Sequence, residues 1–481
     1  MRARGRYVPL VMAAGSGSLL FLSDYPAHRW ALQLVALIPW LWALSMPHRA
    51  KTQPATGLDQ YRWALDAALI GLALGLFYTG PLLAVTAFPW PMALGLGVYI
   101  TGIWVALSVA AAYTLRWPRV LGALGVGAAA VVAEWLSAHA VPVWGTAQSF
   151  VRVWSAAPWA IQFVDITGTP GIVFVLVTTQ ALVVRLALGI HQRSRHAIAL
   201  VALLSSVAVY DAVRWFERPT GSIRVAATGW VDAQLPRGLS TPSQVIVETL
   251  LLPMFKDAVD QGAVLVVSPE TGFAVSPWTR DAAFEPLLQF ARNHSVALAV
   301  GYFDRGRNDN RIALIDATGT LQGEYRKTHL IPLMEDYQAG DGSRVALTVQ
   351  GHRVGGMICQ DDNFTDIASD YGRNAYPLVV VPTNDWHAVK DYHLENSRMR
   401  PLENRYAIVR AATNGISTIV SARGEVLAER DHFAAGPGVA VADVPIYRPG
   451  SLHAWVRHGF VLLCASMLLL LGWLARRGSA T

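Results

Sequence analysis

The chain has 481 residues, of which 53% are hydrophobic and only 15% are charged. A soluble domain usually carries about 25% charged residues, so this composition excludes a single soluble domain and indicates a protein that lies partly in a membrane. The formal net charge is +6, but the sequence has no basic face or nucleic-acid recognition motif. Many basic residues instead stand in short loops beside apolar runs, so we predict no nucleic-acid partner.

Eight apolar stretches suggest membrane helices. About 20 residues are needed to cross the hydrocarbon core of a bilayer, and most of the stretches are long enough. We predict helices at 7–23, 30–46, 64–87, 91–114, 120–140, 171–189, 196–212 and 455–474. The first is interpreted as a retained helix, because no convincing small-residue cleavage site follows its N-terminal arginines. The predicted domains are therefore a membrane bundle at 1–213 and a C-terminal transmembrane helix at 455–475.

The loop charges predict an orientation for these helices. Basic residues gather before the first helix, at alternate loops thereafter and after the last helix, whereas the loop Phe88–Pro91 carries no charge. By the positive-inside rule, both termini are cytoplasmic. Seven crossings then place residues 214–454 on the outer face of the membrane.

Residues 220–445 have ordinary charge and a different pattern, and we predict that they form one domain. Helical patterns lie at 242–260, 281–293 and 393–411. Short β-branched runs, read as strands, lie at 223–228, 264–267, 296–301, 312–315, 355–358, 378–381, 416–421 and 439–441. Strands that alternate with helices favour a layered α/β architecture.

A carboxylate, an ammonium group and a thiol follow strand-like runs in this region, in the order Glu270, Lys327, Cys359. A thiolate is a nucleophile, Glu270 could accept its proton, and Lys327 could stabilise the oxyanion of a tetrahedral intermediate. Such a set supports acyl transfer through a thioester. The only other cysteine, Cys464, lies in the last apolar run and is interpreted as a packing residue.

The local sequences around these residues resemble the three motifs of the nitrilase superfamily. They are Ser268-Pro-Glu270, then Tyr325-Arg-Lys327-Thr-His-Leu-Ile-Pro332 with Glu335, and Met357-Ile-Cys359. Pro382-Thr-Asn-Asp-Trp386 resembles a later loop of the same family. The resemblance implies an αββα sandwich with a Glu-Lys-Cys triad.

One membrane branch of that superfamily, the apolipoprotein N-acyltransferases, places such a domain between several membrane helices and a final one. The segments Glu134-Trp135, Pro142-Val-Trp144-Gly and Ile161–Gly171 resemble that branch. The resemblance implies that a phospholipid donates a fatty acyl chain to Cys359. The chain then passes to the α-amino group of a diacylglyceryl-cysteine lipoprotein. It also implies the bacterial inner membrane, with the catalytic domain on the periplasmic face.

From the resemblance we predict supporting roles for Glu335 and Asp361. Contacts with substrate are expected from Trp386, Trp144, Gln360 and Glu134. No metal or other cofactor is predicted, because the histidines lack a ligand grouping and there is no nucleotide-binding loop. Glu134 also has a simpler interpretation, as a solvated carboxylate at the membrane interface.

The sequence departs from the branch at three places. Gln360-Asp361 stands where a Tyr and a Glu are usual, Met334 replaces a small residue, and the segment 336–350 is short where the family has a longer apolar arm. The short segment leaves a second hypothesis open, a membrane-tethered amidase or an acyltransferase for a different amine. A third hypothesis, a non-catalytic scaffold or transporter, is disfavoured by the intact triad and by the scarcity of charged residues within the membrane spans.

Overall fold

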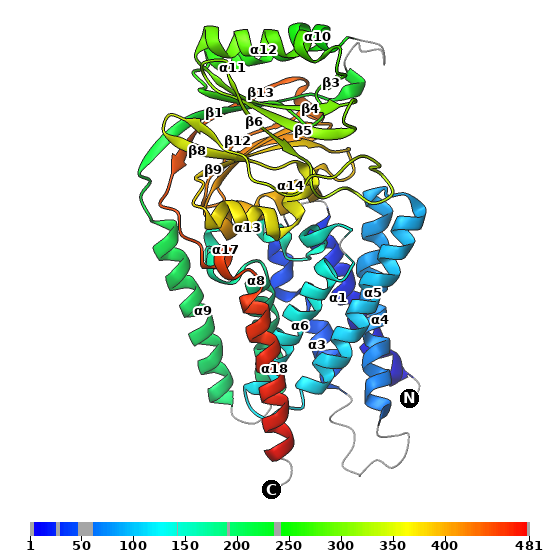
Figure 1. Cartoon of the computed structure of the whole chain (residues 1–481). Helices are drawn as coiled ribbons and strands as arrows, with labels where there is room; N and C mark the ends of the chain where they lie inside the picture. Colours follow the sequence, from blue (N-terminus) through cyan, green and yellow to red (C-terminus); the bar gives the residue numbers. More distant parts are fainter. Residues whose placement is uncertain are drawn as a thin grey trace. The chain divides into compact units, whose positions relative to one another are not determined.

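The computed structural model describes residues 4–25, 29–46, 61–141, 143–189, 193–234 and 242–478. The chain divides into two compact units (Figure 1). One unit comprises Met1–Ala212 with His458–Thr481, and the other comprises Val213–Arg457. Among the residues that carried the predicted orientation, Arg2, Arg49 and Lys51 lie outside the described residues.

The first unit is helical. Its long helices are α1 (Arg4–Asp24), α4 (Arg62–Thr86), α5 (Trp90–Thr114), α6 (Leu121–His139), α8 (Pro170–Ala187), α9 (Arg193–Trp215, which runs into the second unit) and α18 (Gly459–Gly478). In the described part of the chain, six helices are long and apolar enough to cross a membrane, and Trp30–Ser45 and Gly459–Leu474 are shorter apolar helices. The prediction of a bundle of apolar helices is thus confirmed.

The second predicted membrane helix, 30–46, is not one continuous helix. It is divided into η1 (Trp30–Leu32), α2 (Gln33–Ala36) and α3 (Ile38–Ser45), with Pro39 in the first turn of α3. Proline has no backbone N–H and its ring crowds the preceding turn, so a helix tends to begin at it rather than run through it.

Short turns connect α6 to α8 in the helical unit. They are η4 (Gly145–Gln148), η5 (Arg152–Ala156), η6 (Pro158–Ala160) and α7 (Val164–Thr167). Arg152 is fully buried, donates to the carbonyl of Ser149 at 3.0 Å and lies 3.5 Å from Asp24. A buried charge is tolerated when it is paired in this way.

The second unit contains two β-sheets. The first has the order β13 (Gly438–Ile446), β1 (Gly221–Gly229), β2 (Leu265–Val267), β4 (Ala297–Asp304), β5 (Asp309–Ile315) and β6 (Leu321–Arg326), with β3 (Ala274–Val275) beside β4. The second has the order β12 (Val426–Asp431), β11 (Ile416–Val420), β10 (Ala407–Thr413), β9 (Leu378–Asn384), β8 (His352–Gly356) and β7 (Leu347–Val349). At the centre of each sheet the strands are parallel: β1, β2 and β4 in one, β8, β9 and β10 in the other.

The two sheets pack face to face. One continuous core contains Val225 and Leu265 from the first sheet together with Val354, Val380 and Val409 from the second. A backbone bridge between Trp230 and Thr413 also joins the sheets where β1 and β10 end. Parallel strands have their carboxyl ends on the same edge, so residues that follow these strands gather there.

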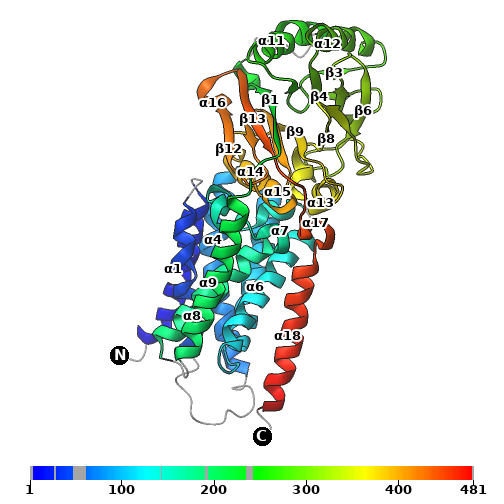
Figure 2. The same ribbon diagram turned by 90° about the vertical axis from the view of Figure 1, so that its left-hand side faces the viewer.

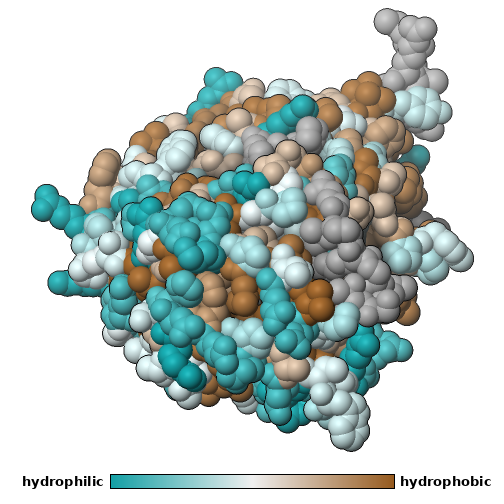
Figure 3. Space-filling view, turned by 90° about the horizontal axis from the view of Figure 1, so that it is seen from above, coloured by the Kyte–Doolittle hydropathy of each residue, from teal (hydrophilic) through white to brown (hydrophobic). Residues whose placement is uncertain are grey.

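Helices cover the outer face of each sheet (Figures 1 and 2). On the first sheet lie α10 (Ser243–Ile246), η8 (Val247–Leu251), α11 (Leu252–Asp260) and α12 (Arg280–His294), which bury Phe255, Phe284 and Leu287. On the other side lie α13 (Thr365–Arg373), α14 (Lys390–Ser397), α15 (Met399–Asn404) and α17 (Leu452–Val456). The surface over α11 and α12 mixes hydrophilic and hydrophobic residues (Figure 3). The predicted αββα sandwich is confirmed.

The predicted helix at 393–411 is wrong in its second half, because residues 407–413 form strand β10. All seven residues of β10 are buried, and a strand that is buried on both faces reads as a continuous apolar run that resembles a buried helix. Arg405 has a positive φ of 60° and ends α15. The sequence interpretation also missed β3, β6, β7 and β12, which are short or lie near the sheet edges.

Candidate active site

Cys359 lies at a sharp turn after β8. Its φ is 45°, a left-handed conformation that is costly for a residue other than glycine and is often found at functional sites. The turn continues as η9 (Cys359–Asn363). Cys359 thus stands where the extended chain of β8 gives way to this turn.

Glu270 follows β2 in the first sheet, and its position depends on Gly301 in β4. The N–H of Ser268 donates to the carbonyl of Ala299 at 2.9 Å, and the N–H of Gly272 donates to the carbonyl of Gly301 at 3.1 Å. A Cβ atom on Gly301 would come within 2.1 Å of the carbonyl oxygen of Pro269. The glycine therefore allows the backbone that carries Glu270 to lie against β4.

Lys327 follows β6 in the same sheet. Its N–H donates to the carbonyl of Asn310 on β5 at 2.9 Å, and its carbonyl accepts from the N–H of Gly340 at 2.7 Å. The side chain of Lys327 is 1% exposed, so its charge is satisfied by protein groups.

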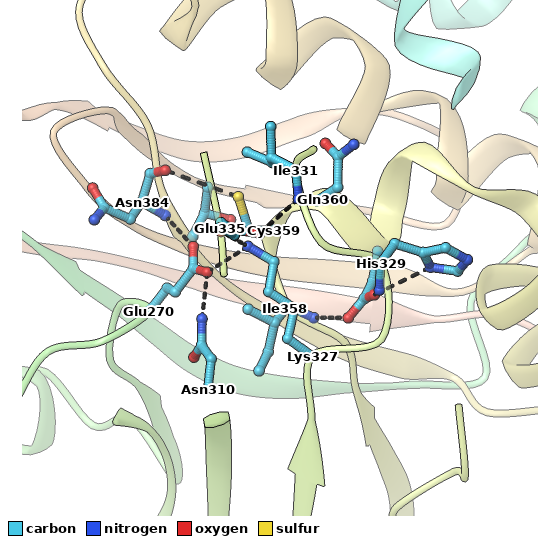
Figure 4. Close-up of polar contacts among 12 residues, drawn as sticks. Glu270, Asn310, Lys327, His329, Ile331, Glu335, Ile358, Cys359, Gln360 and Asn384 are labelled. Carbon is cyan, nitrogen blue, oxygen red and sulfur yellow. Dashed lines mark hydrogen bonds and ion pairs between the residues drawn. The ribbon is translucent and has the colours of Figure 1, made fainter. Parts of the chain in front are cut away.

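The three residues meet in one buried cluster (Figure 4). Lys327 Nζ donates to Glu270 Oε1 at 2.8 Å and to Glu335 Oε1 at 2.6 Å. The cysteine Sγ lies 3.9 Å from the carbonyl oxygen of Asn384. Glu270 and Cys359 are each 3% exposed. Strand ends from both sheets therefore bring together the carboxylate, ammonium group and thiol predicted from the sequence.

Burial is the largest influence on the pKa values of Glu270, Cys359 and Lys327. It raises the pKa of Glu270, an effect partly offset by the charge of Lys327. Burial, followed by the negative charge of Glu270, raises the pKa of the Cys359 thiol well above its usual value. For Lys327, burial by itself would lower the pKa, but Glu270, Cys359 and Glu335 raise it well above the ordinary value. The resting site thus holds a neutral thiol beside a carboxylate whose raised pKa suits it to accept a proton.

The two predicted supporting residues have distinct structural roles. Glu335 accepts from Lys327 and, through Oε2, from the N–H of Ile331 at 2.8 Å. The buried carboxylate of Asp361 accepts from the N–H groups of Thr328 (3.1 Å), His329 (2.7 Å) and Ile358 (3.1 Å) and from the hydroxyl of Tyr325 (2.8 Å), and the ring Nδ1 of His329 also lies 3.2 Å from it. Asp361 therefore ties the segment that follows Lys327 to the turn that carries Cys359.

The residues predicted to contact substrate lie in different places. Gln360 is buried in the nucleophile turn and accepts from Asn363 at 2.8 Å, while Trp386 is half-buried two residues after Asn384. Glu134 and Trp144 belong to the helical unit. The ring of Trp144 is buried with its centroid 5.1 Å from that of Phe88.

Glu134 lies on α6, within the helix and not at its end. It lines a small pocket in the helical unit, together with residues from α4, α5, α6 and η4. The carboxylate atom Oε1 is buried, while the residue as a whole is half-buried.

Two residues that complete the surroundings of Glu270 were not predicted. Asn310 Nδ2 donates to Glu270 Oε1 at 2.6 Å, and the N–H of Asn384 donates to Glu270 Oε2 at 2.7 Å. Asn384 ends β9 and lies in the segment Pro382–Trp386 that carried part of the family resemblance. Asn310 has no motif around it, and only the pairing of β5 with β6 brings it beside Lys327.

The prediction that the histidines lack a grouping of metal ligands is also wrong for His393. One ligand atom each from His393, Asp385 and Cys359 lie within 4.8 Å of one another. However, Nδ1 of His393 is 2.8 Å from Asp385 and Nε2 is 3.2 Å from Asp362. With both ring nitrogens bound to carboxylates, the ring has no nitrogen left to bind a metal ion.

Comparisons with known proteins show what this chain is similar to. Residues 224–452 match the carbon-nitrogen hydrolase family. The chain is 29% identical to an apolipoprotein N-acyltransferase of Gloeobacter violaceus, over 99% of this chain and 96% of the relative. It is 26% identical to that of Bradyrhizobium diazoefficiens, over 89% of this chain and 90% of the relative. Among solved structures, an amidase from Nesterenkonia sp. aligns at 22% identity with a TM-score of 0.42, over 51% of this chain and 98% of the amidase.

The sandwich, its triad and the matched region define a protein of the carbon-nitrogen hydrolase, or nitrilase, superfamily. Since the relatives extend over the apolar helices as well, the chain is a multi-pass membrane protein. Along nearly its whole length it is similar to the apolipoprotein N-acyltransferases.

Proposed function

We propose that the protein is an N-acyltransferase that moves a fatty acyl chain from a phospholipid, through a thioester on Cys359, to the α-amino group of a diacylglyceryl-cysteine lipoprotein. The observation that carries this proposal is the buried Glu270–Lys327–Cys359 cluster in a chain whose apolipoprotein N-acyltransferase relatives match it nearly end to end. The glutamate, lysine and cysteine have the chemistry of base, oxyanion donor and nucleophile.

In the first half-reaction, Sγ of Cys359 attacks the carbonyl carbon of the phospholipid ester while Glu270 accepts the thiol proton. An ammonium group has three N–H donors. Lys327 uses two of them for Glu270 and Glu335 among the described residues, and we assign the third to the oxyanion. The ester C–O bond then breaks, Glu270 returns its proton to the departing oxygen, and a lysophospholipid leaves the acyl thioester on the enzyme.

In the second half-reaction, the amine nitrogen of the acceptor attacks the thioester carbonyl and Glu270 accepts a proton from that nitrogen. The C–S bond breaks as the amide forms, and the proton passes to the sulfur. Because both half-reactions need a proton acceptor and an oxyanion donor at the same points, one set of residues serves both.

An exposed apolar tip next to the cluster supports a lipid substrate. Leu333 is 82% exposed and Met334 is 45% exposed, and they immediately precede Glu335. The short segment 336–350 adds little apolar surface, since its Val345 packs against the sandwich core. An apolar pair beside a polar catalytic cluster suits an acyl chain.

The alternative acceptor, a different amine or water, is not favoured by the relatives, which are apolipoprotein N-acyltransferases, but one structural feature bears on it. Residues 336–346 run without helix or strand from the site to β7, so a long apolar arm is missing from this part of the sandwich. An enzyme with a smaller apolar rim has fewer contacts with which to reject other amines.

We expect purified enzyme with labelled phospholipid to acylate the amine of a diacylated lipopeptide. Trp386→Ala should slow amine transfer more than thioester formation, because Trp386 is assigned to the acceptor and lies in the loop after Asn384. Mass spectrometry of the lipopeptide and of the intact enzyme measures the two steps separately. Trp278→Ala is the matched control, since Trp278 is 91% exposed in the same unit and makes no contact with the triad among the described interactions. A thioester that yields only free fatty acid or another acylated amine would contradict the lipoprotein acceptor.

We further propose that the protein lies in the bacterial inner membrane, with both termini cytoplasmic and the sandwich on the periplasmic face. The positive-inside pattern of the loops supports this orientation. A reporter fused after Arg218 should behave as exported, and one fused after Ala475 as cytoplasmic. A cytoplasmic signal from the Arg218 fusion would overturn the orientation without affecting the proposed chemistry.

A further inference from the structure

A buried group of four charged side chains lies behind the nucleophile and takes no part in the chemistry described above. His393 comes from α14, Asp362 from η9, Asp385 follows β9, and Arg410 lies in β10. The His393 ring joins the two carboxylates, with Nδ1 2.8 Å from Asp385 and Nε2 3.2 Å from Asp362. Arg410 Nη2 donates to the other oxygen of Asp385 at 2.7 Å.

The group lies close to the residues of the proposed active site, both along the chain and in space. Asp385 is next to Asn384, whose N–H binds Glu270 and whose carbonyl oxygen lies 3.9 Å from Sγ of Cys359. Asp362 lies in the turn that begins with Cys359. The sulfur itself lies within 4.8 Å of ligand atoms of both His393 and Asp385. His393 thus links the turn that carries Cys359 to the end of β9. The spacing of these two segments determines where the Cys359 thiol lies relative to Glu270.

The charges of the group balance only when His393 is protonated. Two carboxylates then face one imidazolium and one guanidinium, all nearly or fully buried. With a neutral residue in place of His393, a surplus negative charge would remain close to the sulfur. In a site of low dielectric, that charge would oppose formation of the thiolate.

We propose that His393 is a positioning residue for the nucleophile: its imidazolium, held between Asp362 and Asp385, fixes the Cys359 turn against the end of β9 and cancels the negative charge next to the sulfur. The proposal rests on Cys359 as the nucleophile, in common with the proposed function. It does not depend on which lipid donates the acyl chain or which amine receives it.

The protonation of His393 gives the site a pH dependence. The groups that face the ring are Asp362, Asp385, Arg410 and Cys359, and Glu395 is buried on its own helix. Burial by itself would lower the pKa of His393, but the two carboxylates raise it to about 9. The imidazolium charge is therefore present at neutral pH and is lost above about pH 9.

The test measures how fast iodoacetamide alkylates Cys359 between pH 6 and 10, by peptide mass spectrometry of the full chain in a Cys464→Ala background. His393→Gln should lower the rate about tenfold or more near neutral pH, the change in thiolate fraction that one pKa unit produces. Combining it with Asp362→Asn removes the surplus charge and should restore the rate to within about threefold, a coupling that a double-variant cycle detects. The parent protein should show a break in its profile near pH 9 that His393→Gln lacks.

His432→Gln is the matched control, since His432 is also fully buried in the same unit but its pKa is lowered to about 4 by burial, which leaves the ring neutral. Its alkylation rate should equal that of the parent. Thioester formation from phospholipid, followed in the same variants, should rank them in the same order. Parent-like rates in a folded His393→Gln variant would overturn the proposal, as would a double variant no faster than the single one. Failure of the lipoprotein acceptor assay would leave these alkylation rates unchanged.

Discussion

Cys359→Ala is expected to abolish both the acyl adduct and all transfer of the acyl chain. The sulfur is the atom that forms and breaks the thioester, and alanine has no nucleophile to replace it. Intact-protein mass spectrometry after incubation with phospholipid should find an added acyl mass on the parent protein and none on the variant. The lipopeptide should remain unmodified.

The control for this prediction is the second cysteine. Cys464 is buried on α18 in the helical unit, in a different unit from the triad, so Cys464→Ala should keep both the adduct and the transfer. An acyl adduct that persists in Cys359→Ala would assign the nucleophile to another residue.

Glu270→Gln is expected to slow thioester formation by about 10²–10⁴-fold, the usual contribution of a general base. A glutamine amide keeps the size of the side chain, but it cannot take the proton of the thiol. Asn310 and Asn384 donate to different oxygens of Glu270, so the single amide oxygen of glutamine can keep only one of these two hydrogen bonds. The raised pKa of the Cys359 thiol makes this loss severe, because almost no thiolate forms without a base. Single-turnover mass spectrometry of the acyl adduct measures the rate directly.

Glu285→Gln provides a comparison for that variant, since Glu285 is an exposed carboxylate on α12 of the same unit. It should form the adduct at the parent rate. If Glu270→Gln also formed the adduct at the parent rate, another group would have to be the base, and the proposed pathway of the proton would be wrong.

Much of the architecture was predictable because local sequence patterns specify it. Apolar runs of about 20 residues predict membrane-spanning helices from their length alone, and six of the eight predicted positions hold helices long enough to cross a membrane among the described residues, while the second and the last hold shorter apolar ones. The β-branched runs likewise marked the central strands β1, β2, β4, β8 and β9. Strand β10 was missed because its residues are buried on both faces, and burial on both faces removes the alternation that distinguishes a strand from a helix.

The triad residues were recognisable from the sequence because their types and flanking motifs are specific, even though 57 residues separate Glu270 from Lys327 and 32 separate Lys327 from Cys359. The distances between these residues and their pKa values could not be predicted from the sequence. These depend on the packing of one sheet against the other and on the burial that results.

The sequence by itself thus determined the class of chain and its helical and α/β parts, and it carried the proposal of Cys359, Glu270 and Lys327 as nucleophile, base and oxyanion donor. Only the tertiary structure decided which polar groups surround them. Asn310 reaches Glu270 because β5 pairs with β6, and His393 reaches Asp362 and Asp385 because α14 packs beside the nucleophile turn. No local pattern marks either residue, since a hydrogen bond between distant segments depends on the position of both backbones, and that position exists only once the two sheets and their helices have packed together.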